Sequence, residues 1–247
     1  MSNYYYGQGR VWIAPVTDGV ITGGYTEVGD ADLLEITPSQ EFLDIQESQS
    51  GNRQRVKHLE IGSNFSFNMQ IKEITSENLQ KAFYGTLTEN VAAVSHTESV
   101  TGYNGAMTPL TYPNVSNVSV SVQGGGGPLV LDTDYSLDTK NGHIVILTGH
   151  THVDLSGNGP WTLDVTYDYA ANDLIKFAKS DLAHYAIRFE GKNVAEGGRA
   201  EIVTIHNVAL NMSTTLSLID TTENTLTVGG EALPDANDDT VTYVQTA

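Results

Sequence analysis

Two histidines and an aspartate in one short segment are the residues best suited to do chemistry. Residues 149–152 read Gly-His-Thr-His, and Asp154 follows two residues later. Imidazole nitrogens and carboxylates are common ligands of divalent metals, so one interpretation of the segment is a metal site, and the corresponding enzyme is a metal-dependent hydrolase. The simpler interpretation is that His150 and His152 share one face of a strand or loop and contact only solvent.

The rest of the chain does not complete such a catalytic centre. Metallophosphoesterases carry a similar Gly-His-Thr-His segment, but they also need an upstream Asp-x-His, a Gly-Asp and a Gly-Asn-His-Asp, and only Gly29-Asp30 occurs here. The glycines at 124–127 precede Pro128 and not the Lys-Ser or Lys-Thr of a phosphate loop. The sequence has no Gly-x-Ser-x-Gly elbow. We therefore expect no enzyme, no catalytic residue, no metal and no cofactor.

The composition excludes several further classes of function. The 247 residues include 12 Lys and Arg against 30 Asp and Glu, which gives a net charge of -18. Such a balance argues against tight binding to the outside of nucleic acid or to anionic lipid. Cysteine is absent, so disulfides and thiolate metal sites are excluded. No stretch reaches the roughly 18 apolar residues of a membrane helix, so we expect a soluble protein without membrane insertion.

Hydrophobic periodicity predicts a mainly β protein. Apolar residues alternate with polar ones at 65–71, 118–123, 163–169 and 185–190, which is typical of strands with one buried face. One helix is predicted at 76–84, where Thr75 or Ser76 can cap the start and Gly85 can end it. Residues 171–180 fit a helix and a strand about equally. Weaker strand patterns lie at 10–16, 31–37, 40–47, 55–62, 129–131, 143–147, 201–211 and 240–245.

The middle of the chain has the features of an inserted module. Residues 86–117 are rich in Thr, Ser, Asn and Gly, and a compact run of predicted strands follows them. Within that run, Asp134-Tyr135 and the later Asn141-Gly142 indicate a hairpin, because Asn-Gly readily adopts the positive φ angles of a tight turn. We expect 98–170 to be a small, immunoglobulin-like β module on the exterior of a core domain formed by 1–97 and 171–247.

Several loose motifs resemble one known family, the major tail tube proteins of long-tailed, siphophage-type bacteriophages. The likeness covers most of 1–85 and 183–247, and 98–170 lies outside it. The motifs are Gly-Arg-Val-Trp-Ile-Ala-Pro at 9–15, Glu-Val-Gly-Asp at 27–30, Glu-Ser-Gln-Ser-Gly-Asn-Arg at 47–53 between two predicted strands, the helix that ends at Gly85, Phe-Glu-Gly-Lys-Asn at 189–193 and the run 201–218.

The resemblance implies a β-sandwich or barrel-like tail tube fold with one flanking helix, and a structural role in the virion tail. Hexameric rings of such subunits stack into a tube, and their inner strands close into a barrel of about 24 strands, wide enough for hydrated duplex DNA. The implied partners are further copies of the chain, the tape measure protein during assembly, the tail terminator and the distal tail or baseplate proteins. Genomic DNA would pass through during ejection without tight binding, and synthesis would take place in the host cytoplasm.

The resemblance also assigns the contact between rings to a long loop between two strands. In this sequence the loop runs from about Gln46 to Lys57, and its basic residues are expected to pair with carboxylates on the neighbouring ring. The alternative is an exposed hairpin tip whose charges are only solvated. The expected contact residues are Glu47, Ser50, Gly51, Arg53, Arg55 and Lys57.

Two other functions fit the same sequence. One is a different β-rich virion part, such as a tail terminator, a baseplate hub or a decoration or adhesion module. The other is the metal-dependent hydrolase that would use His150, His152 and Asp154. The net charge likewise has two interpretations, because the acidic residues can be a solvated surface or the repulsive lining of a DNA channel.

Overall fold

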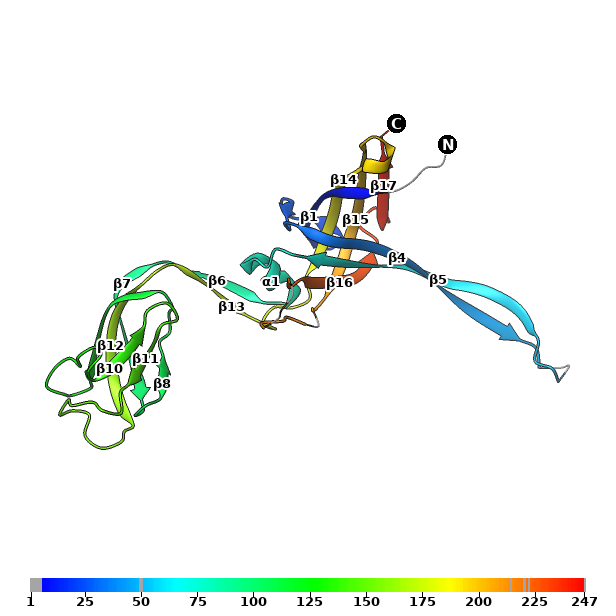
Figure 1. Cartoon of the computed structure of the whole chain (residues 1–247). Coiled ribbons are helices and arrows are strands. Elements are labelled where there is room, and N and C mark those ends of the chain that lie inside the picture. The colour runs from blue at the N-terminus through cyan, green and yellow to red at the C-terminus, as the bar shows by residue number, and fades with distance from the viewer. Residues whose placement is uncertain (1–5, 49–50, 214, 220, 222, 247) are drawn as a thin grey trace. The chain divides into compact units, whose positions relative to one another are not determined.

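The computed structural model describes residues 6–48, 51–213, 215–219, 221 and 223–246, and these form a mainly β fold with a single α-helix, as predicted (Figure 1). The helix is α1 (Ser76–Ala82), and a short 3-10 turn follows at Val194–Glu196. Within the described ranges no helix is long and apolar enough to cross a membrane. The strands are β1 (Gly7–Thr17), β2 (Val20–Ile21), β3 (Thr26–Glu27), β4 (Ala31–Gln46), β5 (Arg55–Ile71), β6 (Thr86–Asn90), β7 (Ala93–Gly102), β8 (Met107–Pro109), β9 (Val115–Val122), β10 (Tyr135–Asp138), β11 (His143–Ile146), β12 (Trp161–Tyr169), β13 (Asn172–Lys176), β14 (His184–Asn193), β15 (Arg199–Asn211), β16 (Leu226–Leu233) and β17 (Val241–Gln245).

The chain divides into two compact units. The core unit comprises Met1–Leu87 and Ile175–Ala247, and the inserted unit comprises Thr88–Leu174. The inserted unit is therefore longer at both ends than the expected 98–170. A boundary at 98 would cut β7, which pairs with β12 from Ala93 to Gly102 and so belongs to the inserted unit as a whole.

The strands of the core unit form one sheet that divides at β15. The order is β2-β1-β14-β15-β16-β5-β4, with β3 on β1. The first half of β15 pairs with β17 and the second half with β16, so the sheet splits into two parts. Both parts contribute to one core, which makes the arrangement sandwich-like. Central core residues are Val11, Ile13, Phe67, Met69, Ile187, Ile205 and Val228.

Helix α1 lies where its capping residues predict it. Thr75 is the N-cap and its side chain accepts a hydrogen bond from the backbone N–H of Asn78 at 3.2 Å. The buried Asn78 side chain donates to the carbonyl oxygens of Val28 and Glu73 at 2.8 and 2.9 Å. These bonds fix the helix start against the segments that flank β4 and β5.

The longest strands differ from the sequence prediction because two pairs of predicted strands are continuous. The patterns at 31–37 and 40–47 are one strand, β4, and those at 55–62 and 65–71 are one strand, β5. Proline 38 does not end β4, because β4 is an edge strand and one side of it makes no ladder bonds. Residues 171–180 contain β13 and no helix, and 129–131 form no strand.

The inserted unit is a small sandwich with its own core. Its sheets have the orders β7-β12-β9 and β10-β11-β8. The predicted hairpin is present, with Asp138 opposite His143 and Gly142 at a φ of 66°. Strands β6 and β13 form a separate two-stranded sheet. The buried residues that both larger sheets share include Val120, Tyr135, Ile144, Ile146, Leu163 and Val165.

Candidate assembly surfaces of the core unit

The outer half of the β4–β5 ladder extends beyond the sheet as a free two-stranded hairpin (Figure 1). Strand β16 pairs with β5 only from Phe65 to Ile71. Residues 39–46 of β4 and 55–64 of β5 therefore pair with each other and, among the described residues, with no other strand. We call these residues the distal hairpin. A two-stranded hairpin without a core beneath it is marginally stable in water, so a partner that covers this part of the chain stabilises it.

One face of the distal hairpin carries exposed aliphatic side chains. Leu43 lies directly opposite Leu59, and alternation along the strands places Ile45 and Ile61 on the same side. These four residues are 48%, 43%, 42% and 61% exposed, in the order Leu43, Leu59, Ile45 and Ile61. Lys57 lies opposite Ile45, so one cation shares this face. We call the four aliphatic residues the hairpin apolar face.

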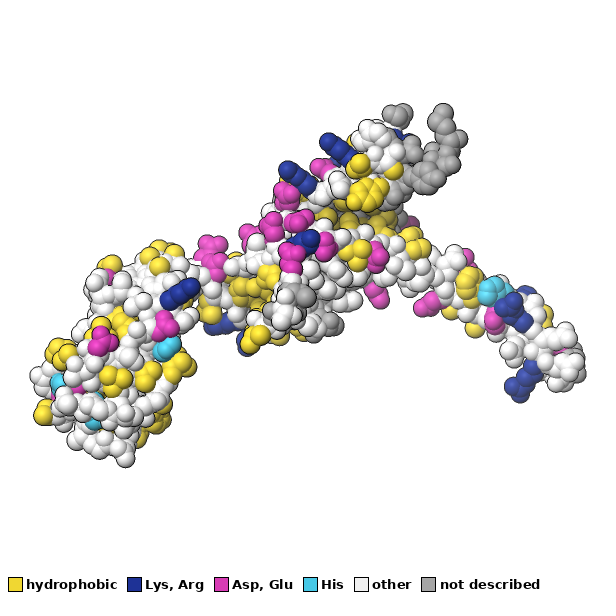
Figure 2. All heavy atoms as spheres, in the orientation of Figure 1, with side chains coloured by type: hydrophobic (Ala, Val, Ile, Leu, Met, Phe, Trp, Pro, Cys, Tyr) yellow, Lys and Arg dark blue, Asp and Glu magenta, His cyan; other side chains and the backbone are white. Residues whose placement is uncertain are grey.

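The opposite face of the distal hairpin carries Phe42 and polar side chains that contact one another. The rings of Phe42 and His58 stack with centroids 4.3 Å apart. The Asp44 carboxylate lies 2.5 Å from Nδ1 of His58 and 3.4 Å from the Arg55 guanidinium. The hydrogen bond from His58, with a further contribution from Arg55, lowers the pKa of Asp44 below its ordinary value. The register thus places the Asp44 cluster on one side of the hairpin and the hairpin apolar face on the other. Figure 2 shows hydrophobic side chains beside Lys or Arg and His side chains along the hairpin.

The turn contains three of the contact residues expected from the sequence. The backbone N–H of Glu47 donates to the carbonyl of Gln54 at 2.9 Å and closes the hairpin. Gly51 and Arg53 have positive φ angles of 79° and 47°. Positive φ is open to glycine without strain and uncommon for arginine, so the turn shape depends on Gly51. Ser50 lies outside the described residues.

The two remaining contact residues lie on the strands. Arg55 forms an ion pair with Asp44 of the same hairpin, so part of its charge is already compensated inside the subunit. Exposed pairs of this kind contribute little to stability, and they exchange readily for other partners. Lys57 is exposed on the side of the hairpin apolar face. The aliphatic residues beside it were not among the expected contact residues, although their alternation is visible in the sequence.

The outer side of β4, β5 and β16 is a second, mainly polar surface. Residues Phe67, Met69 and Val228 of these strands point into the core, so the residues that alternate with them point away from it. The register aligns this outer side in rows across the three strands. We call it the polar sheet face. Its polar and glycine residues are Glu35, Thr37, Ser66, Asn68, Gln70, Thr227, Gly229 and Glu231, which include two carboxylates and no Lys or Arg, and Leu33 lies opposite Gln70 on the same side.

The histidine segment at 149–154 serves the packing of the inserted unit. The His150 ring meets Trp161 edge to face, with centroids 5.4 Å apart. The Asp154 carboxylate accepts a hydrogen bond from the backbone N–H of Gly126 at 2.7 Å and lies 3.6 Å from the His152 ring. Across the described ranges no group of three or more His, Cys, Asp or Glu side chains is arranged to hold a metal ion. The structure does not bring the three predicted side chains together as ligands.

A buried aspartate outside the predicted motif organises this segment. Asp134 is 2% exposed, and its carboxylate accepts backbone N–H bonds from Val130 at 2.9 Å and from Thr151 and His152 at 3.1 Å. Burial acts to raise the pKa of Asp134, but these three hydrogen bonds outweigh it and lower the pKa. Asp134 precedes Tyr135 in the predicted hairpin, and the sequence alone does not mark it as buried.

One family model matches the chain. It covers residues 4–243, and the family is described as Protein of unknown function UCP028589. No curated protein matches the chain.

Replacing Asp134 with alanine is expected to destabilise the inserted unit by about 3 kcal/mol, because three backbone N–H groups lose the buried carboxylate that accepts their hydrogen bonds. The two tryptophans lie in different units, so a Trp12→Phe background makes Trp161 fluorescence the reporter of the inserted unit during urea unfolding. Glu89→Ala, at an exposed position of the same unit, is the matched control. An Asp134→Ala midpoint equal to that of the control would contradict the assigned role.

Proposed function

The chain belongs to the UCP028589 family, and we propose that it is a structural virion protein, the subunit of the stacked hexameric rings that form the tail tube of a long-tailed bacteriophage. Genomic DNA passes through the bore of this tube during ejection. The observation that carries the proposal is the distal hairpin, whose apolar face is exposed and is not packed against any other part of the described chain.

The hairpin apolar face favours assembly over a monomeric role. Isolated apolar side chains on a protein surface are ordinary, but a contiguous aliphatic patch on a projecting element marks an interaction surface. Fully burying a leucine or isoleucine contributes about 1.5–3 kcal/mol, and these four side chains are roughly half buried already. Covering all four therefore contributes on the order of 4 kcal/mol per subunit, repeated at every copy.

The position of the hairpin favours an open-ended assembly. The distal hairpin projects from one side of the core unit, so a second copy can receive it on a surface other than its own hairpin. A contact between two different surfaces is heterologous, and a heterologous contact that does not close generates a filament. Stacked rings are one such filament.

The strand edges favour closure within a ring. Strand β4 ends the sheet, and its outer edge has no strand partner among the described residues. Open edges pair readily with other chains, and closing a sheet into a barrel removes them. Pairing of the part of β4 that follows Leu34 with the adjacent subunit satisfies this edge and limits growth around the ring to one turn.

The polar sheet face suits a surface that DNA passes without binding. Duplex DNA carries one negative charge per roughly 1.7 Å, and proteins grip it mainly through Lys and Arg. The polar sheet face contains Glu35 and Glu231 and neither of these cations. If β4, β5 and β16 line the bore, six copies surround the DNA with polar groups and repelling carboxylates.

The remaining parts of the proposal follow from the same role. The protein acts in the virion tail, is made in the host cytoplasm, and has no catalytic activity or cofactor. Its partners are further copies of itself, the tape measure protein during assembly, the tail terminator and the distal tail or baseplate proteins. The inserted unit has its own core and its own sheets, so it adds an exterior module without altering the core unit.

Serine at both Leu43 and Leu59 is expected to abolish filament formation while the subunit stays folded, because the hairpin apolar face loses its central pair and the core is untouched. Sedimentation measures assembly, and circular dichroism measures the fold. Val153→Ser, which changes an exposed aliphatic side chain of the inserted unit, is the control and should assemble normally. Filaments of normal yield from the double variant would refute the role of this face.

The double variant Glu35→Lys/Glu231→Lys is expected to make assembled tubes retain duplex DNA that wild-type tubes release, because two carboxylates on the polar sheet face become ammonium groups and the net charge of each chain rises by four units. Retention should weaken as salt rises, since it depends on phosphate contacts. The matched variant Glu89→Lys with Asp181→Lys changes net charge equally at exposed positions elsewhere. Equal DNA release from both variants would contradict the assignment of β4, β5 and β16 to the lining of the bore.

A further inference from the structure

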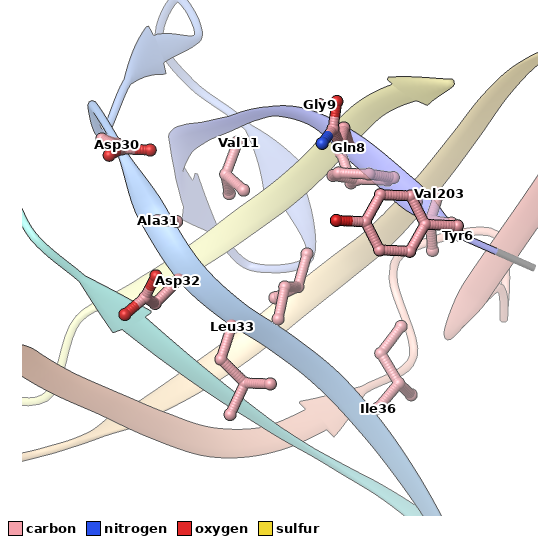
Figure 3. A pocket seen from close by; sticks show the side chains of 13 residues that line it. Tyr6, Gln8, Gly9, Val11, Asp30, Ala31, Asp32, Leu33, Ile36 and Val203 are labelled. Carbon is pink, nitrogen blue, oxygen red and sulfur yellow. The ribbon is translucent and has the colours of Figure 1, made fainter. Parts of the chain in front are cut away.

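An open groove of about 700 Å³ lies between β1 and β4 in the core unit (Figure 3). One side is formed by Gly7–Gly9 of β1 and the other by Ala31–Leu34 of β4, with Tyr6 beside the first. Figure 3 shows Asp30 and Asp32 toward one end of the groove and Tyr6 and Gln8 toward the other. The apolar side chains of its lining are Val11, Leu33, Leu34, Ile36, Phe189 and Val203.

Both sides of the groove are strand edges. Residues 7–10 of β1 pair with β14 on one edge, while β3 joins the other edge only at Trp12 and Ile13. Strand β4 pairs with β5 and with no other strand among the described residues. An extended segment placed in the groove therefore meets backbone N–H and C=O groups as well as apolar side chains, as in recognition by strand addition.

The end of the groove near Asp30 is acidic. Asp30, Asp32, Glu27 and Glu73 lie around it, and the neighbouring cations are Arg10 and Lys72. Lys72 pairs with Asp32 at 2.8 Å and Arg10 with Glu27 at 3.5 Å. Four carboxylates against two cations leave an excess of negative charge. A well-matched occupant is apolar along its length and carries a cation at one end.

The distal hairpin of this chain has that pattern. Its apolar face presents Leu43, Ile45, Leu59 and Ile61, and Lys57 lies on the same side. Of the 12 Lys and Arg residues in the chain, three lie at positions 53–57. The charge of the hairpin face thus complements the acidic end of the groove, and its aliphatic side chains complement the groove lining.

The two surfaces lie at opposite ends of the same ladder. The groove is formed by the first residues of β4, and the hairpin apolar face begins about ten residues later, which is roughly 33 Å at ~3.3 Å per residue. This separation prevents the hairpin from filling its own groove. It places donor and acceptor surfaces head to tail, which is the arrangement that propagates along an axis.

We propose that the groove between β1 and β4 is the acceptor site for the distal hairpin of a second copy of this chain, with Lys57 of one copy directed to Asp30 of the other. The inference rests on the proposed tube function and goes beyond it, since it names the surface on which each hairpin docks. Other occupants of the groove are alternatives that the test below separates.

Cross-linking tests the contact directly, because the chain has no cysteine and every introduced thiol is unique. Gln8→Cys places a thiol in the groove at an exposed position, and Leu59→Cys places one on the hairpin. The two variants are mixed, assembled and treated with a short bismaleimide. We expect a heterodimer that a control mixture of Thr227→Cys with Leu59→Cys does not give, because Thr227 lies on the polar sheet face.

Charge exchange is the second arm of the test. Lys57→Glu should reduce filament yield, and adding Asp30→Lys to the same chain should restore it. Heterodimer formation together with restored yield supports the acceptor site. If filaments form but neither result appears, the groove proposal is overturned while the tube function stands. If wild-type chains form no rings or filaments at all, both proposals fall.

Discussion

The ladder between β4 and β5 is the constraint on which the rest of the structure depends. Its inner half pairs with β16 and shares the core of the subunit, so its register is fixed by buried side chains such as Phe67 and Met69. Its outer half is the same ladder without a core beneath it. Because the strands are continuous, the core unit holds the distal hairpin in a defined direction before any partner binds. This preorganisation lowers the entropic cost of docking, since the hairpin need not fold when it binds.

Along the same ladder, the alternation of side chains between the two sides of the strands defines three surfaces: the groove, the polar sheet face and the hairpin apolar face. Near its start, one side faces the core and the groove, and the other side is the polar sheet face. Beyond residue 39 the hairpin is amphipathic in its own right, with Leu43 on one side and Asp44 on the other. A shift of one residue in the register would exchange these sides along the whole ladder. The DNA-facing surface and the stacking surface of the proposed tube are thus set by one alignment of two strands.

Much of the fold can be predicted from the sequence, but the groove and the polar sheet face cannot. Period-two alternation locates β5, β12 and β14, and Thr75 locates α1, since these depend on local pattern. Strand β16 was missed because Gly229-Gly230 interrupts its pattern. The structure explains Gly230, because a side chain there would clash with the backbone oxygen of Ala209 and meet the Phe67 ring at 2.8 Å. The groove and the polar sheet face combine residues far apart in sequence, so their recognition requires the strand register.

Electron cryo-microscopy of the concentrated, purified protein tests the central claim most directly. The account predicts hollow tubes of stacked hexameric rings in which β4, β5 and β16 line the bore and each distal hairpin reaches the adjacent ring. Particles that remain monomeric at high concentration, also in the presence of the tail-tip complex that initiates assembly, would contradict it. So would an assembly without a central channel.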